Sequence, residues 1–294
     1  MGVLDRAQPP LTQPACVCAG KPAQLRRPTQ CVGPPPVGGR GLVVLRGIVA
    51  AAGLLALWQG FVWITDVPPF LLPSPWRVAQ ALAARWESIA GHALVTGAEM
   101  LAGLALGAIL GSAMALTLSA WRGGRRWLLP LLLVSQAVPV FAIAPLLTLW
   151  FGFGMASKVV MATLIIFFPV ATAFYDGLRR TDPGLLDLAA TMGATKGAML
   201  WRIRLPSALP ALASGLRVAA AVAPIGAVVG EWVGASAGLG YLMLHANGRS
   251  QADVMFAALF VLALMALALW FTVDRLLRRA IPWQPDSLLS DKTP

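Results

Sequence analysis

Long uncharged, apolar stretches separated by short charged ones make up most of the chain. A charge near the centre of a bilayer costs at least about 2.5 kcal/mol, so uncharged stretches mark the places where a chain crosses a membrane. Four of them are close to the length of one helical crossing, about 20 residues. They are residues 47–65, 100–121, 159–175 and 254–273. This pattern predicts an all-α membrane protein.

Two further stretches predict less regular crossings. Residues 127–157 form a longer window with three prolines, and we expect it to cross with a kink or a re-entrant end. Residues 209–230 contain Arg217 and Pro224, and their low hydropathy predicts a helix buried among other helices. The chain is therefore expected to have about six transmembrane helices.

The basic residues fall mainly on one side of these helices. The chain is 58% hydrophobic and 12% charged, with a net charge of +11. If the N-terminus is cytoplasmic, 18 of the 23 Lys and Arg residues lie on inside segments and four on outside segments, with Arg217 inside a helix. Cytoplasmic loops of membrane proteins are enriched in Lys and Arg, so both termini of this multi-pass protein are predicted to be cytoplasmic. The orientation of the protein in the membrane therefore explains its net positive charge, and no nucleic-acid partner is needed to explain it.

The two ends differ in composition from the apolar middle. Residues 1–41 hold eight prolines and six glycines, which predicts a disordered cytoplasmic tail. Cys16, Cys18 and Cys31 lie in this tail. We interpret them as incidental thiols, since three thiols without a nearby histidine do not complete a tetrahedral metal site. Residues 42–280 are expected to form the transmembrane domain, and residues 281–294 a cytoplasmic C-terminal tail.

Three glycines recur every four residues in the second predicted crossing, at Gly103, Gly107 and Gly111. This spacing places them on one stripe of a helix, where a neighbouring helix can approach closely. We expect a helix-packing face. The alternative is a glycine stripe that lines a pore.

The segment between the fourth and fifth predicted crossings, residues 177–208, is too long for a simple connection. Asp182 and Pro183 predict the start of a short helix, and Gly193 permits its sharp end. A second short helix is expected to follow and to end at Pro206. Such a pair is either a surface hairpin without a partner or a compact element that fits a groove on another protein.

The same segment resembles the EAA loop of ABC importer permeases. That loop reads Glu-Ala-Ala, three residues, Gly, nine residues and Ile-x-Leu-Pro; here Asp187 replaces the glutamate and Leu188 the first alanine. The resemblance implies a cytoplasmic coupling helix. It assigns contact with an ATPase to Asp187, Leu188, Ala189, Gly193, Ile203, Leu205 and Pro206.

Other segments resemble the branch of these permeases that imports nitrate, sulfonates, taurine and the thiamine pyrimidine precursors, over roughly residues 65–280. They include residues 72–75, 139–158 and 230–241. The resemblance implies a type I ABC importer permease fold in the cell inner membrane. It also implies a permease homodimer, two ABC ATPase subunits and a periplasmic or extracellular solute-binding protein.

None of the four lysines lies in a G-x-x-x-x-G-K-[ST] phosphate-binding loop. ATP is therefore expected to bind to a separate partner subunit. The chain itself is expected to be no enzyme and to need no cofactor or metal.

Glu99 and Glu231 lie at the outer ends of the second and fifth predicted crossings. They are expected either to face the solute pathway or to hydrogen-bond backbone and headgroups at the interface. In the pathway they would repel anions such as sulfonate and nitrate, which favours a neutral or cationic solute. Trp232 and Tyr241 are expected either to stack on a heteroaromatic solute or to belong to the interfacial aromatic belt.

On this basis the expected solute is a hydroxymethylpyrimidine or another thiamine precursor, and residues 230–234 resemble permeases for such solutes. The alternative solutes are an aliphatic sulfonate, taurine or nitrate. Two alternatives from other classes are an intramembrane enzyme that uses Glu99, Glu231 or His92, and a passive channel. Neither of these explains the cytoplasmic loop.

Overall fold

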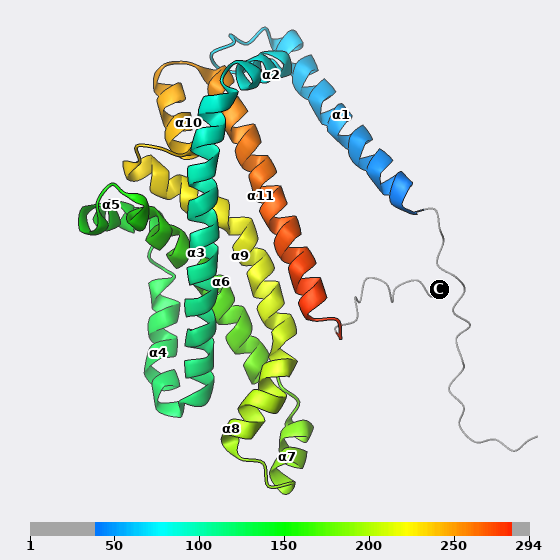
Figure 1. Ribbon diagram of the computed structural model, residues 1–294, viewed down its shortest axis with the longest axis vertical. Helices are drawn as coiled ribbons and strands as arrows, with labels where there is room; N and C mark the ends of the chain where they lie inside the picture. Colours follow the sequence, from blue (N-terminus) through cyan, green and yellow to red (C-terminus); the bar gives the residue numbers. More distant parts are fainter. Residues whose placement is uncertain (1–38, 284–294) are drawn as a thin grey trace, which may run out of the picture. The chain divides into compact units, whose positions relative to one another are not determined.

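The computed structural model describes residues 39–283, and this part of the chain folds into helices and turns without a strand. The helices, shown in Figure 1, are α1 (Gly39–Thr65), α2 (Pro75–Ala84), α3 (Trp86–Ala120), α4 (Arg122–Ser135), α5 (Val140–Phe151), α6 (Met155–Arg179), α7 (Pro183–Thr191), α8 (Lys196–Met199), the π-helix Leu200–Arg204, α9 (Leu205–Gly234), α10 (Leu239–Gly248) and α11 (Ala252–Ala280). The predictions for the tails 1–41 and 281–294 fall almost wholly outside the described residues.

Two compact units divide the chain between Ala52 and Gly53, within α1. The second unit contains α2 to α11 and carries the features described below. Within it, α7 and α8 lie at the end opposite α2 and α10 (Figure 1).

Five helices in the described part of the chain are long and apolar enough to cross a membrane. They are Leu45–Thr65, Trp86–Ala120, Met155–Arg179, Lys196–Gly234 and Ala252–Ala280. They correspond to the crossings predicted at 47–65, 100–121, 159–175, 209–230 and 254–273, and four contain the predicted range whole, while Trp86–Ala120 ends one residue before Trp121. The prediction of an all-α membrane protein is confirmed.

The proline-containing window at 127–157 does not form one crossing. It contains most of α4, all of α5 and the start of α6, and residues 136–139 between α4 and α5 are turn and irregular backbone. Pro139 has no N–H to donate to a helix, and it disfavours helical geometry at Val138. The expected irregularity is therefore a full break between two short helices of 14 and 12 residues.

Small residues hold α6 between α3 and α9. A Cβ atom on Gly103 or Gly107 would lie 2.5 Å from Ala162 Cβ or Ile166 Cγ2, respectively, on α6. A Cβ atom on Gly226 of α9 would lie 2.8 Å from Ala162 Cα. The glycine stripe of α3 therefore lies directly against α6, where any side chain would separate the two helices.

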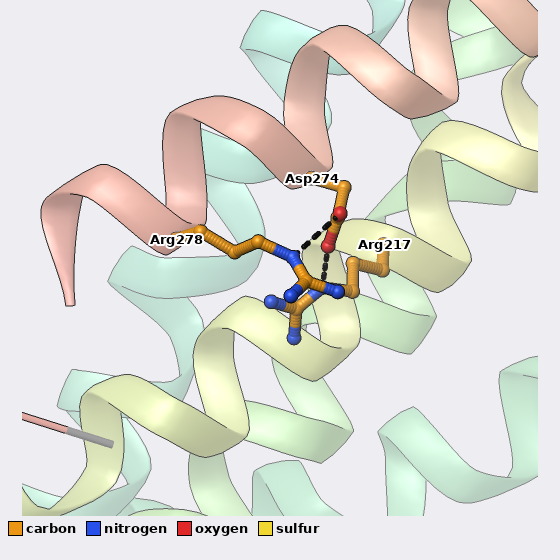
Figure 2. Close-up of polar contacts among 3 residues, drawn as sticks. All are labelled: Arg217, Asp274 and Arg278. Carbon is orange, nitrogen blue, oxygen red and sulfur yellow. Dashed lines mark hydrogen bonds and ion pairs between the residues drawn. The ribbon is translucent and has the colours of Figure 1, made fainter. Parts of the chain in front are cut away.

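An ion cluster joins α9 to α11 near the end of α11 (Figure 2). Arg217 Nε donates to Asp274 Oδ1 at 2.7 Å, and Arg278 Nε donates to Asp274 Oδ2 at 2.8 Å. Arg217, which the sequence places inside a crossing, thus has an acidic partner on another helix. Charged groups inside membrane helices are commonly paired in this way.

Candidate functional site

The loop between α6 and α9 is built from two capped helical segments. The Asp182 carboxylate caps α7 by accepting from the Gly184 N–H at 2.8 Å, and Pro183 occupies the first turn. α7 ends at Thr191, and Gly193, two residues later, has a φ of +77°, a conformation that glycine adopts without strain. Thr195 then caps α8 by accepting from the Ala198 N–H at 3.2 Å. The positions of Asp182, Pro183 and Gly193 are those expected from the sequence.

The second helix of the loop does not end at Pro206, contrary to the expectation. It continues through the π-helix Leu200–Arg204 into α9, so that Lys196–Gly234 is one helical segment of 39 residues. The Leu205 N–H donates to the Leu200 carbonyl, five residues back. This wider turn precedes Pro206, so the proline falls at the first turn of α9, where its missing N–H is tolerated.

A shallow cavity of about 350 Å³, which we call the coupling groove, lies between α7 and the start of α9. It is lined by Leu185, Leu188, Ala189, Met192, Arg202, Ile203, Pro206 and Ser207. Large apolar side chains of the groove are exposed on the surface of the subunit: Leu188 is 58% exposed and Met192 is 79% exposed. The groove and the exposed apolar side chains around it form a surface suited to another protein.

The coupling groove brings together four of the seven residues predicted to contact an ATPase: Leu188, Ala189, Ile203 and Pro206. The other three do not line the cavity. Asp187 and Gly193 are exposed beside it, and Leu205 packs against the core formed by α3, α4 and α6. Met192 and Arg202 also line it, although they were not predicted to make this contact. The sequence nevertheless contains a signal for Met192. Its helical spacing from Leu185 and Leu188 places all three side chains on one face of the helix.

Glu99 and Glu231 lie together inside the subunit, in what we call the acid cluster (Thr96, Glu99, Glu231, Leu239 and Gly240). Both acids are only 1% exposed. The Thr96 hydroxyl donates to Glu231 Oε1 at 2.6 Å and accepts from the Leu239 N–H at 2.8 Å. The Gly240 N–H donates to Glu231 Oε2. The cluster therefore fixes the start of α10 against α3 and α9.

Burial changes the electrostatic argument from Glu99 and Glu231. Since neither carboxylate reaches the surface of the subunit, their position gives no support to the expected repulsion of anions. Glu231 instead accepts from the backbone N–H of Gly240. A role for either acid in the solute pathway remains a prediction.

The two predicted aromatic residues occupy different settings. Trp232 is half-exposed near the end of α9. Tyr241 on α10 lies beside two imidazole rings, with centroids 4.2 Å from His245 and 5.8 Å from His92. His92 Nδ1 also accepts from the Gly238 N–H at 3.1 Å. Stacking on a solute by Trp232 or Tyr241 remains a prediction.

Curated relatives of this chain are permeases. It is 53% identical to a probable ABC transporter permease protein of Haemophilus influenzae, over 81% of this chain and 97% of the relative. It is 38% identical to the formylaminopyrimidine transport permease protein of Halalkalibacterium halodurans, over 74% and 87%. Taurine and aliphatic sulfonate permease proteins of Escherichia coli are also related to it.

The fold has a counterpart among solved structures. An inward-facing structure of the MetNI methionine ABC transporter superposes with a TM-score of 0.58 at 21% sequence identity, covering 67% of this chain and 97% of that one. The family model for the inner membrane component of binding-protein-dependent transport systems matches residues 103–283. These residues include α4 to α11 and the coupling groove. The chain therefore belongs to the family of ABC importer permeases, which are membrane transport subunits and not enzymes.

Proposed function

We propose that this chain forms the solute pathway of an ATP-driven importer and is moved by a separate ATPase that docks in the coupling groove. The exposed apolar groove between α7 and α9 is the observation that carries the proposal. Because α7 is joined to α6 on one side and to α8 on the other, a docked partner acts on two membrane helices at once. Its movement would switch the helices between inward-open and outward-open arrangements.

The complete importer would contain two copies of this chain, two ATPase subunits and an external solute-binding protein. One coupling groove on each chain supports a permease dimer for two ATPases. The Lys and Arg bias supports cytoplasmic N- and C-termini, with the coupling groove on the cytoplasmic side of the cell membrane.

Gly193→Val tests the coupling. A β-branched side chain at a φ of +77° is strained, which should displace the end of α7 from the coupling groove. We expect the protein to remain in the membrane while ATP hydrolysis stimulated by the solute-loaded binding protein falls at least roughly tenfold, equivalent to about 1.4 kcal/mol. The measurement is ATP hydrolysis and uptake by the complete importer in proteoliposomes.

Gly197→Val is the matched control. Gly197 is also exposed in the loop, but it has helical geometry and no atom within 4 Å of an added Cβ. Its variant should keep stimulated hydrolysis. Normal stimulation in Gly193→Val would contradict the coupling role, and wild-type uptake without ATP would favour a passive channel.

For the solute, we propose a hydroxymethylpyrimidine or a related thiamine precursor. The relationship to a permease named for formylaminopyrimidine supports this choice. The alternative is an aliphatic sulfonate, taurine or nitrate, supported by the motifs shared with that branch and by relatives named for taurine and aliphatic sulfonates.

The cognate solute-binding protein provides the direct test of the solute. A ligand at 100 times its Kd stabilises a folded protein by about 2.7 kcal/mol, which a thermal-shift measurement detects. We expect stabilisation by hydroxymethylpyrimidine and none by taurine, alkanesulfonate or nitrate. Stabilisation by taurine, an alkanesulfonate or nitrate instead would replace the proposed solute and leave the importer assignment intact.

A further inference from the structure

The length of α4 sets the depth of the break between α4 and α5. Gln136 follows Arg126 by ten residues, and the helical rise of 1.5 Å per residue places it about 15 Å further along. The hydrocarbon core of a bilayer is about 30 Å thick. If the basic start of α4 lies at one membrane surface, residues 136–139 lie near the middle of the bilayer.

The backbone of this break is open to the surface of the subunit. Residues 136–139 are all exposed, and Val138 is 46% exposed. Irregular backbone at this depth is not stable against lipid, because its polar groups lack partners there. It persists where it is covered by protein or lines a water-filled cavity. This face of the subunit therefore belongs to the interior of the assembled importer.

A cavity of about 300 Å³ lies beside the break. It is lined by Gln136, Val140, Ile165, Phe168, Pro169 and Thr172. The Thr172 hydroxyl donates to the Phe168 carbonyl at 2.8 Å, which leaves its oxygen able to accept from a ligand. Pro169 has no N–H, so the Ile165 carbonyl lacks its usual donor four residues on. Gln136 adds an amide that can donate and accept.

None of the six lining residues carries a charge. An anion such as a sulfonate would lose its hydration here without gaining a cationic partner from these side chains, which is unfavourable. A neutral ring with its own N–H groups and ring nitrogens matches the hydroxyl, the amide and the carbonyl. The Phe168 ring offers a face or edge for stacking.

We propose that this cavity is a solute subsite on the wall of the pathway and that it takes a neutral, planar heteroaromatic ring. The proposal rests on the proposed importer function and adds a binding position and a chemical class to it. Glu99, Glu231, Trp232 and Tyr241 do not line this cavity.

Thiol labelling tests whether the cavity opens into the pathway. In a background with Cys16, Cys18 and Cys31 changed to serine, Gln136→Cys is exposed to the membrane-impermeant reagent MTSET in the complete importer. We expect rapid modification, slowed by hydroxymethylpyrimidine. Leu264→Cys is the control at a similar depth. Leu264 is exposed on α11 and lies ten residues from the charged residue Asp274, just as Gln136 lies ten residues from Arg126. The thiol at this position should react slowly, because thiols react as thiolates, and a thiolate forms in water and not in lipid.

Uptake of radiolabelled hydroxymethylpyrimidine tests the chemistry. Thr172→Val removes the hydroxyl, and loss of one neutral hydrogen bond should raise the KM of uptake roughly three- to tenfold. Thr272→Val is the matched control, since the Thr272 hydroxyl makes the same bond to a carbonyl four residues back but is exposed on α11. Its KM should not change.

The outcomes separate the two proposals. Without ATP-dependent uptake of any solute by the wild type, the proposed function fails, although labelling still reports on the cavity. With normal uptake, an unreactive Gln136→Cys or an unchanged KM in Thr172→Val overturns the subsite. Transport of taurine in place of hydroxymethylpyrimidine overturns its assignment to a neutral ring.

Discussion

Single polar residues inside this protein mainly join neighbouring helices through hydrogen bonds. Thr96 on α3 contacts Glu231 of α9 and the backbone of Leu239 in α10. Gly238, with a φ of +117°, lies so close to the Glu231 carboxylate that no side chain would fit between them. The acid cluster therefore needs a hydroxyl at 96 and a glycine at 238 to close.

We predict that Thr96→Val destabilises the subunit. The change leaves one Glu231 oxygen and the Leu239 N–H without their buried partner, and an unsatisfied buried group costs about 1–3 kcal/mol. The apparent melting temperature of the detergent-purified protein should fall. Thr117→Val on the same helix is the control, because the exposed Thr117 hydroxyl bonds only to the Ala113 carbonyl. Equal melting temperatures for the two variants would refute the role of Thr96.

The sequence identifies Glu99 and Glu231 as unusual residues but not their surroundings. Acids near the ends of apolar stretches are visible in the sequence, and so is the glycine that permits the turn at 193. The rotation of each helix about its axis depends on its neighbours, which lie far away in the chain. For the same reason, the partner of Arg217 was not predictable, although Asp274 and Arg278 have the spacing of a helical ion pair.

At the scale of helices, the arrangement depends on close contacts along α6. Three glycines of α3 face it on one side, and Gly215 and Gly226 of α9 face it on the other. Such contacts exclude even a methyl group. Van der Waals packing at this short distance holds the helices together, because the hydrophobic effect is weak between helices in lipid.

We predict that Gly107→Ala lowers stability by about 1–3 kcal/mol, the usual effect of forcing an extra group into a tight contact. Its Cβ would lie 2.5 Å from Ile166 Cγ2. Gly91→Ala on the same helix is the control, because no atom lies within 4 Å of its Cβ and alanine favours helix. Unfolding of the two variants in detergent should differ, with Gly91→Ala as stable as the wild type or more so.

The sequence predicts helices better than it predicts their interruptions. Five apolar stretches correspond to long helices because length and hydropathy alone decide membrane crossing. Two prolines were less informative. Pro139 coincides with a complete break, whereas Pro206 is absorbed by the π-helical turn before it. The local sequence does not decide between these outcomes, because each depends on whether the surrounding helices can accommodate the freed backbone groups.

At the scale of the whole molecule, the subunit is incomplete by itself. It exposes an apolar groove at one end and the irregular backbone of residues 136–139 between α4 and α5. Both features require other chains or water-filled space. This agrees with its membership of a family whose members work within importer complexes.

We therefore predict that the purified importer contains two copies of this chain and two ATPase subunits. Each chain offers one coupling groove, and a second copy would form the opposite wall of the pathway, across from the face that carries residues 136–139. Native mass spectrometry of the detergent-solubilised complex measures this stoichiometry directly. A single copy, or a pair formed with a different permease chain, would contradict the homodimer.

The glycine contacts along α6 also limit how these helices can slide. Axial slippage of α6 past α3 or α9 would push side chains into the places that glycines leave free, until a whole turn of about 5.4 Å had been passed. Small axial steps are thus blocked, while joint rotation of the three helices leaves every contact in register. A partner that binds α7 would therefore rotate α3, α6 and α9 together as one rigid unit.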